Sequence, residues 1–460
     1  MRDAAQVLVA GGGPAGSVAA GLLARAGARV TLLESARFPR YHIGESILPS
    51  CLPVLDLLGA REKVERHGFV RKGGAWFEWG PENWELNFDH IRGTERHSYQ
   101  VVRSEFDQLL LEHAGEQGVE VVEGTSVRRV EFDGDRAVAA SWAQGDRTGR
   151  IAFDHLVDAT GRAGVLATRH LGNRTYNEAF RNVATWGYWR GAKPLDRGPQ
   201  GAIAVCSVPD GWFWGIPLHD GSYSVGLVTS KIRFAERREE AGGDLRAMYA
   251  TAVAECARIA DLLEPAEMVG ELKTEQDYSY ACDRFAGPGW LMAGDSACFL
   301  DPLLSTGVHL ATFSGLLAAA SIGSVSRGEI SEPEAWAFYD RAYRQSYERL
   351  LVLVSLLYSS YRREAHLFQA DKLTRRERRM LALYESFLQV VSGIEDLADA
   401  RESGLDAVAA RLASGADVGG HNKAMDALPD SEGSAVGGLY LAYEPRLGLR
   451  RVAGAPAPTP

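Results

Sequence analysis

Cysteine is scarce in this chain of 460 residues, and its five cysteines lie far apart. They form no C-x-x-C pair and their number is odd, which argues against a disulfide framework or a zinc site and favours a reducing compartment. We therefore expect no bound metal and a cytoplasmic protein. The sequence also shows no signal-peptide pattern and no run of about 18 uncharged apolar residues, so no membrane contact is expected.

An excess of basic residues is also missing, because the net charge is −10. This charge argues against a nucleic-acid partner, since phosphate neutralisation needs clustered Lys and Arg. Lysine is rare, with 7 lysines against 43 arginines. The length and the 46% hydrophobic content predict a globular protein of two or three units.

The first fifty residues predict a dinucleotide site. Residues 7–10 are an apolar run, and a G-G-G-P-A-G turn, a helical stretch to Ala26 and a second apolar run at 28–33 follow. Glycines at such a turn allow close backbone approach to a diphosphate at a helix N-terminus, and an acidic residue 18 positions later can bind a ribose hydroxyl. The residues expected to bind are Gly11, Gly13, Pro14, Ala15, Gly16 and Glu34.

Two later turns favour FAD over NAD. The segment 158–162, which begins at Asp158, closes the apolar run 155–159, and Gly294-Asp295 follows the apolar run 290–293. Together with the first turn, they resemble the FAD-binding fold of p-hydroxybenzoate-hydroxylase-like flavoproteins over residues 1 to about 325. The resemblance implies flavin contacts at Arg103 and Ser46; a surface arginine and a plain helix N-cap are the alternatives.

This resemblance implies an α/β fold class with an FAD-binding Rossmann-like domain, an inserted β-sheet substrate domain and a helical C-terminal region. We expect an FAD-binding core at 1–325. Its Rossmann-like segments are about 1–60, 100–165 and 270–325, and its β-rich substrate-side segments are about 66–100 and 180–270. Residues 326–460 should form the helical region, with an irregular tail from Ala416.

A tryptophan motif narrows the function. Residues 211–217 read G-W-F-W-G-I-P, and on a strand Trp212, Trp214 and Ile216 share one face, with Pro217 next in the chain. Core aromatics are the alternative interpretation. The motif resembles the W-x-W-x-I-P signature of flavin-dependent halogenases, where the two indoles separate the flavin from the substrate.

A second motif fits the same family. Residues 299–307 match F-x-x-P-x-x-S-x-G and open an apolar helix, whose first amide groups and dipole would face an anion. The resemblance implies that Pro302 lies at the flavin and that Ser305, Thr306 and Gly307 hold the halide; Ser305 or Thr306 could equally be a helix N-cap.

Lys72, followed by small residues and then a strand, resembles the essential lysine of this family. A primary amine can be desolvated to a useful pKa, and it can then hydrogen-bond hypohalous acid or be halogenated. A solvated surface lysine is the alternative.

The resemblance implies FAD as cofactor, used in its reduced form and supplied by a separate flavin reductase, with chloride or bromide as substrate. A flavin C4a-hydroperoxide would oxidise the halide, and the hypohalous acid would reach Lys72. Tryptophan halogenases carry a glutamate where this chain has Leu304, so we expect a phenolic or pyrrolic substrate of natural-product biosynthesis, such as an antibiotic precursor.

A basic stretch suggests a partner. Residues 361–380 hold seven basic and three acidic residues, which could dock an acidic acyl or peptidyl carrier protein bearing the substrate. A solvated helix face is the alternative. Two other functions stay open at this point: a flavin-dependent aromatic monooxygenase (hydroxylase) or related FAD reductase, and a non-catalytic flavoprotein.

Overall fold

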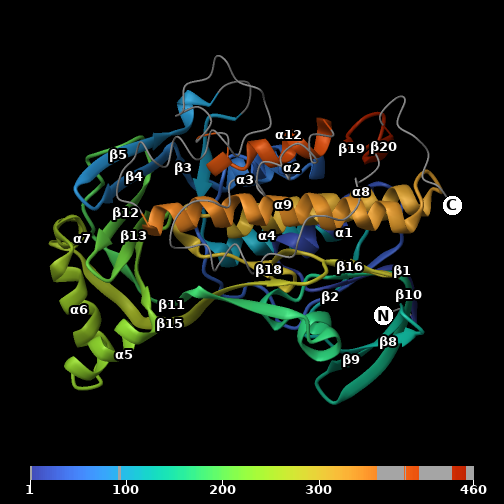
Figure 1. The fold of residues 1–460 in the computed structure, drawn as a ribbon, viewed down its shortest axis with the longest axis horizontal. Coiled ribbons are helices and arrows are strands. Elements are labelled where there is room, and N and C mark those ends of the chain that lie inside the picture. The colour runs from blue at the N-terminus through green and yellow to red at the C-terminus, as the bar shows by residue number, and fades with distance from the viewer. Residues whose placement is uncertain (1–2, 92–94, 360–387, 389, 403–437, 452–460) are drawn as a thin grey trace.

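The computed structural model describes residues 3–91, 95–359, 388, 390–402 and 438–451. Its strands form two large sheets that lie toward opposite sides of the molecule, and the long helix α9 (Glu332–Ser359) runs past both of them (Figure 1). Trp336 near the start of α9 donates to the Gly287 carbonyl of the first sheet, and Trp79 of the second sheet donates to the Leu357 carbonyl near its end. The helix therefore fixes the two sheets relative to each other.

The first sheet has the strand order β16-β17-β10-β1-β2-β7, with β1 parallel to both β2 and β10. β1, β2 and β17 are short apolar runs that are buried on both faces, as expected for a parallel sheet covered by helices. The α/β class expected from the sequence is confirmed. The strands are β1 (Ala4–Ala10), β2 (Val30–Leu33), β7 (Glu120–Val122), β10 (Arg147–Asp158), β16 (Ala286–Gly287) and β17 (Trp290–Met292), extended by β8 (Ser126–Asp133) and β9 (Arg136–Gln144).

The second sheet has the order β18-β15-β11-β14-β13-β12-β4-β5 and is antiparallel except where β12 meets β4. Three helices cover one face, where Phe213 packs on Tyr249, and the opposite face points to the site described below. The strands are β4 (Gly74–Trp79), β5 (Glu82–Asn87), β11 (Arg174–Arg190), β12 (Ile203–Val208), β13 (Gly211–Pro217), β14 (Ser222–Ser230), β15 (Glu267–Cys282) and β18 (Cys298–Phe299). A two-stranded ribbon, β3 (Val70–Lys72) with β6 (Ser98–Gln100), lies beside it.

Helices α1 and α8 pack closely beside the first sheet. Gly315 makes this possible, because a Cβ there would lie 2.6 Å from the Ala15 carbonyl oxygen. Besides α9, the helices of the described residues are α1 (Pro14–Arg25), α2 (Cys51–Leu58), α3 (Arg61–His67), α4 (Arg103–Glu116), α5 (Lys231–Glu240), α6 (Leu245–Glu255), α7 (Ala257–Leu263), α8 (Gly307–Ser326) and α12 (Ile394–Glu402).

Two expectations from the sequence are wrong: that the chain has no uncharged apolar run of about 18 residues, and that its tail is irregular. Helix α8 does reach the length and hydropathy of a membrane span, because its small residues add apolar weight without charge, but 94% of that window is buried inside the protein, as in a core helix. The tail is not irregular throughout: β19 (Leu439–Ala442) and β20 (Gly448–Arg451) form a hairpin whose Leu449 amide donates to Ser324 of α8. Alternating leucines bury one face of this hairpin.

Candidate active site

A cavity of about 620 Å³ is lined by residues from both sheets. It brings together the glycine turn after β1, the segment around Ser46, the face of β13 and the start of α8. Four predicted residues, Gly16, Lys72, Asp158 and Pro217, lie outside its lining. The predicted residues that line it are Gly11, Gly13, Pro14, Ala15, Glu34, Ser46, Arg103, Trp212, Trp214, Ile216, Gly294, Asp295, Pro302, Ser305, Thr306 and Gly307.

The glycine turn needs its glycines for contact with neighbouring backbone. Gly11 has a φ of 107°, and a Cβ there would lie 2.1 Å from the Ala159 carbonyl oxygen. A Cβ on Gly16 would lie 1.9 Å from the Gly11 carbonyl oxygen. Gly11 and Gly16 therefore allow the backbone of the turn to pack closely, and Gly11 and Gly13 line the cavity, whereas Gly16 does not.

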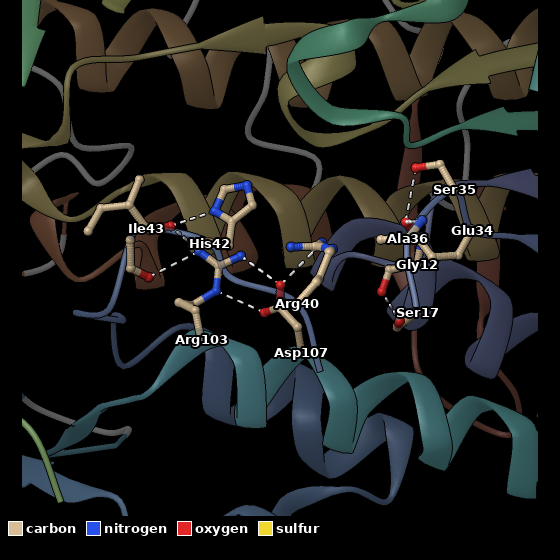
Figure 2. Close-up of polar contacts among 11 residues, drawn as sticks. Gly12, Ser17, Glu34, Ser35, Ala36, Arg40, His42, Ile43, Arg103 and Asp107 are labelled. Carbon is tan, nitrogen blue, oxygen red and sulfur yellow. Dashed lines mark hydrogen bonds and ion pairs between the residues drawn. The ribbon is translucent and has the colours of Figure 1, made fainter. Parts of the chain in front are cut away.

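Glu34 is fixed at the end of β2 by backbone donors. Its Oε2 accepts a hydrogen bond from the Gly12 amide at 2.6 Å, and its Oε1 accepts one from the Ala36 amide at 2.7 Å (Figure 2). A carboxylate offers about four acceptor sites, so it can still bind a hydroxyl in the cavity.

The guanidinium of Arg103 uses most of its hydrogen-bond donors within the protein. Its guanidinium makes a double hydrogen bond to Asp107 at 2.8 and 3.0 Å and donates to the Ile43 and Gly44 carbonyls (Figure 2). Arg40 differs, although its Nη2 lies 3.4 Å from Asp107. Its Nη1 is buried in the cavity wall and has no hydrogen-bond partner among the described residues. Sequence reasoning missed Arg40, since no spacing rule marks it.

Three buried hydrogen-bond donors in the cavity wall lack a partner within the described part of the chain: Arg40 Nη1, Ser46 Oγ and Thr306 Oγ1. The oxygen Glu45 Oε2 of the same wall also lacks one. Buried polar groups are normally hydrogen-bonded. Together with the glycine turn that lines the cavity, the three donors fit a polar ligand that meets an arginine side chain and a helix N-terminus. A dinucleotide such as FAD has this character.

The tryptophans lie as the strand pattern predicts. Trp212 and Trp214 are buried on the cavity face of β13, with ring centroids 6.1 Å apart. Trp186 of β11 extends this wall, 6.2 Å from Trp214. Pro217 is the last residue of β13 and pairs with Tyr223 of β14.

The turn before α8 is strained and uncapped. Ser305 has a φ of 59°, the one positive φ outside glycine in the described residues, and such strain gathers at functional turns. Thr306 occupies the N-cap position, but its side chain makes no capping hydrogen bond. A Cβ on Gly307 would meet no atom within 4 Å. The helix N-terminus therefore offers free amide groups and open space to an anion.

A hydrogen-bond chain connects the two motifs. Tyr358 of α9 accepts from the Trp212 indole at 2.7 Å and donates to Asp301 at 2.8 Å. The same carboxylate accepts from the Leu303 amide and so holds the strained turn. Burial raises the pKa of Asp301. Neither Tyr358 nor the role of Asp301 was expected from the sequence.

Lys72 is buried outside the cavity lining, with 2% of its surface exposed. Its Nζ donates to the Ile47 carbonyl at 3.2 Å and lies 5.5 Å from the centre of the Phe88 ring. Burial lowers the pKa of Lys72 from its ordinary 10.5 to about 7. The amine is thus desolvated, and its partner Ile47 directly follows Ser46, which lines the cavity.

Three further carboxyl groups complete the local electrostatics. Burial raises the pKa of Glu45 to about 7 and that of Asp295 to about 6, and both side chains belong to residues that line the cavity. Asp158 has a different place from the one expected. Its oxygens accept from the Thr160 and Leu166 amides and from the Thr160 hydroxyl, so it holds the turn after β10.

The chain matches a family model described as tryptophan halogenase over residues 6–97 and 89–410. A tryptophan 2-halogenase of Chondromyces crocatus is 42% identical, and the match covers 98% of this chain and 95% of that protein. The sulochrin halogenase gedL of Aspergillus terreus is also 42% identical, over 80% of this chain and 72% of its own.

Among solved structures, the myxobacterial chondrochloren halogenase CndH, described as a variant of FAD-dependent halogenases, superposes with a TM-score of 0.73. The sequences are 36% identical, and the match covers 79% of this chain and 86% of that one. The structural similarity therefore extends over most of this chain.

Proposed function

The chain belongs to the family of flavin-dependent halogenases, and from that premise we propose that it halogenates an electron-rich phenolic or pyrrolic ring, free or tethered to a carrier protein, with Lys72 delivering the oxidised halogen. Membership makes it an oxidoreductase that uses FAD and takes a halide as substrate. The substrate class, the carrier and the residue roles are the proposal. The desolvated amine of Lys72 is the observation that carries it.

The cavity would hold reduced FAD, which when bound would supply the activated oxygen needed to oxidise the halide. We assign its diphosphate to the glycine turn and Arg40, and its ribose to Glu34. The amides at Thr306 and Gly307 would hold the halide, because the helix N-terminus is uncapped there. Trp212 and Trp214 would form an apolar wall that excludes water and keeps the substrate off the flavin.

The substrate proposal depends on Leu304. This side chain is buried beside the strained turn, and it cannot act as the carboxylate base that tryptophan halogenases carry there. Phenols and pyrroles are activated enough to need less help. The name of the Chondromyces crocatus relative makes free tryptophan the alternative substrate. The sequence predicts carrier binding at residues 361–380, which lie outside the described residues, so carrier binding there stays a prediction.

One assay tests the proposal. Purified chain is mixed with FAD, NADH, a flavin reductase and chloride or bromide, and offered simple phenols, pyrrolyl carrier thioesters and free tryptophan. We expect halogenated phenol or pyrrole. Hydroxylated product that does not depend on halide would instead support the monooxygenase alternative, and halogenated tryptophan alone would overturn the substrate class.

Arg40→Ala is expected to weaken FAD binding by about 10- to 100-fold, because a charge-assisted hydrogen bond to a diphosphate contributes roughly 1.5 to 3 kcal/mol. Fluorescence titration of FAD into the purified chain measures this. Arg66→Ala, which removes an exposed arginine, is the control and should bind FAD like the wild type. Unchanged affinity in Arg40→Ala would remove Arg40 from the site.

Gly307→Ala is expected to raise KM for chloride at least about tenfold, because its methyl group would enter the open space at the start of α8. Alanine suits a helix better than glycine by about 1 kcal/mol, so the fold should tolerate the change. Gly115→Ala in α4 is the matched control, since its Cβ would make only an ordinary contact with Val121. An unchanged KM for halide in Gly307→Ala would contradict the assignment.

A further inference from the structure

Five buried polar side chains behind the start of α8 form a continuous hydrogen-bonded cluster. His309 Nδ1 lies 2.9 Å from Ser50 Oγ, and His309 Nε2 lies 2.9 Å from Asp396 Oδ2. Asp396 also accepts from the Ser346 hydroxyl at 2.8 Å and pairs with Arg349. All five residues are 3% exposed or less. The oxygens of Asp396 are thus shared by three side chains.

The cluster connects the two halves of the proposed chemistry. His309 lies in the first turn of α8, two residues after Gly307. Ser50 precedes α2 and lies three residues after Ile47, whose carbonyl accepts from Lys72. Cys51 of α2 is close enough to Lys72 to influence its pKa, and Cys51 also contacts Thr312 of α8. The Ser50–His309 contact therefore joins the segment that holds the lysine to the helix that begins at the halide turn.

The C-terminal region packs directly on this contact. The Ser50 amide donates to the Ser392 carbonyl at 3.1 Å. A Cβ on Gly393 would lie 2.4 Å from Ser50 Oγ and 2.7 Å from the His309 ring. Asp396 follows in the first turn of α12. The segment that leads into α12 thus packs directly on the Ser50–His309 contact.

Burying an ion pair and three polar side chains is costly, and apolar residues of similar size would stabilise the fold as well or better. Such clusters can instead specify one arrangement of the elements they join. Here the elements are the segment 47–51, whose Ile47 carbonyl accepts from Lys72, helix α8 and helix α12. The contacts are specific to one register, because the histidine ring uses both of its nitrogens.

We propose that Ser50, His309 and Asp396 are positioning residues that fix the separation between the halide turn and Lys72, so that oxidised halogen is delivered to the lysine rather than lost. This inference rests on the proposed role of Lys72. It assigns the C-terminal segment 390–402 a part in halogen transfer.

Ser50→Ala is the main test, because it removes one hydrogen bond and leaves the Arg349–Asp396 pair intact. Three quantities are measured: FAD affinity, hypohalous acid captured by an added trap, and the fraction of oxidised halogen found in product. We expect the first two to stay within about twofold and the product fraction to fall at least fivefold. Asp396→Asn is a second, harsher variant with the same expected direction. Ser321→Ala, a buried serine of α8 outside the cluster, is the control and should match the wild type.

A second readout is independent of turnover. An amine-selective reagent is applied to the FAD-free chain across pH, and labelling at Lys72 is followed by peptide mass spectrometry. Displacement of the segment 47–51 should increase the labelling rate at Lys72 at least threefold in Ser50→Ala and leave it unchanged in Ser321→Ala.

Unchanged product fraction and unchanged labelling in Ser50→Ala would overturn the proposal. A parallel fall in FAD affinity, trapped acid and product would also overturn it, by showing a role in the fold alone. If the wild type forms no halogenated product, the proposed function fails, whereas the labelling result still decides whether this cluster positions Lys72.

Discussion

Lys72→Met is expected to lower the rate of halogenation by at least about 100-fold while FAD binding and reduced-flavin oxidation stay within about twofold. A positioned group that acts directly on the reacting atoms contributes roughly 10² to 10⁴ in rate. Lys72 lies outside the lining of the flavin cavity, so its removal should leave the flavin steps untouched. Hypohalous acid should still form, and an added trap should capture it.

Lys72→Arg separates the amine from its charge. A guanidinium stays protonated at any working pH, so it cannot be halogenated as a neutral amine is. We expect this variant to be as inactive as Lys72→Met. Lys231→Met, which removes an exposed lysine of α5, is the control and should keep full activity. Normal halogenation by Lys72→Met would rule out the proposed role of Lys72.

The pH dependence distinguishes two routes at the same amine. In the covalent route the neutral amine takes the halogen from hypohalous acid and water leaves. The N–halogen bond then breaks as the ring carbon takes the halogen and loses its proton. The amine nitrogen takes that proton, which restores the neutral amine. Because the pKa of Lys72 is about 7, product yield in this route should rise with pH around 7. We expect this result; a falling yield across the same range would favour hydrogen bonding by the protonated amine.

The sequence predicted those parts of the site whose function depends on local spacing. The glycine turn, the two tryptophans of β13 and the uncapped start of α8 each lie within one short segment, and the structure brings all three to one cavity. In each case the residues that act together are neighbours on a strand face or at a turn. Periodicity along the chain therefore carries the information.

The remaining parts depend on contacts between distant segments. Trp212 meets Tyr358 across 146 positions, and Ser50 meets His309 across 259. No local pattern marks such pairs, because their partners are decided by how the sheets and α9 pack. Asp158 ends a strand, which predicts a ligand position, and the structure shows that its oxygens also hold the turn after β10.

Lys72→Met is also expected to stabilise the folded chain. The amine has its ordinary pKa of 10.5 when unfolded and about 7 when folded, so between these values the unfolded state binds more protons. The wild type is therefore penalised fully below pH 7, and the penalty disappears as the pH rises toward 10.5. Each pKa unit corresponds to about 1.4 kcal/mol, which sets a ceiling of roughly 5 kcal/mol.

Methionine has a similar length and no charge to desolvate, so it should recover most of this penalty and lose only one hydrogen bond, to the Ile47 carbonyl. At pH 6.5 we expect the free energy of unfolding of FAD-free Lys72→Met to exceed that of the wild type by ~2 to 4 kcal/mol, measured in urea. At pH 9.5 the difference should fall to within about 1 kcal/mol of zero, because most of the penalty has disappeared while the cost of the lost hydrogen bond remains. Lys231→Met should change the free energy of unfolding by less than about 0.5 kcal/mol at either pH. A destabilised Lys72→Met, or a gain that does not depend on pH, would mean that the amine is charged and solvated in the fold, and the lysine would then lack the property that suits it to accept halogen.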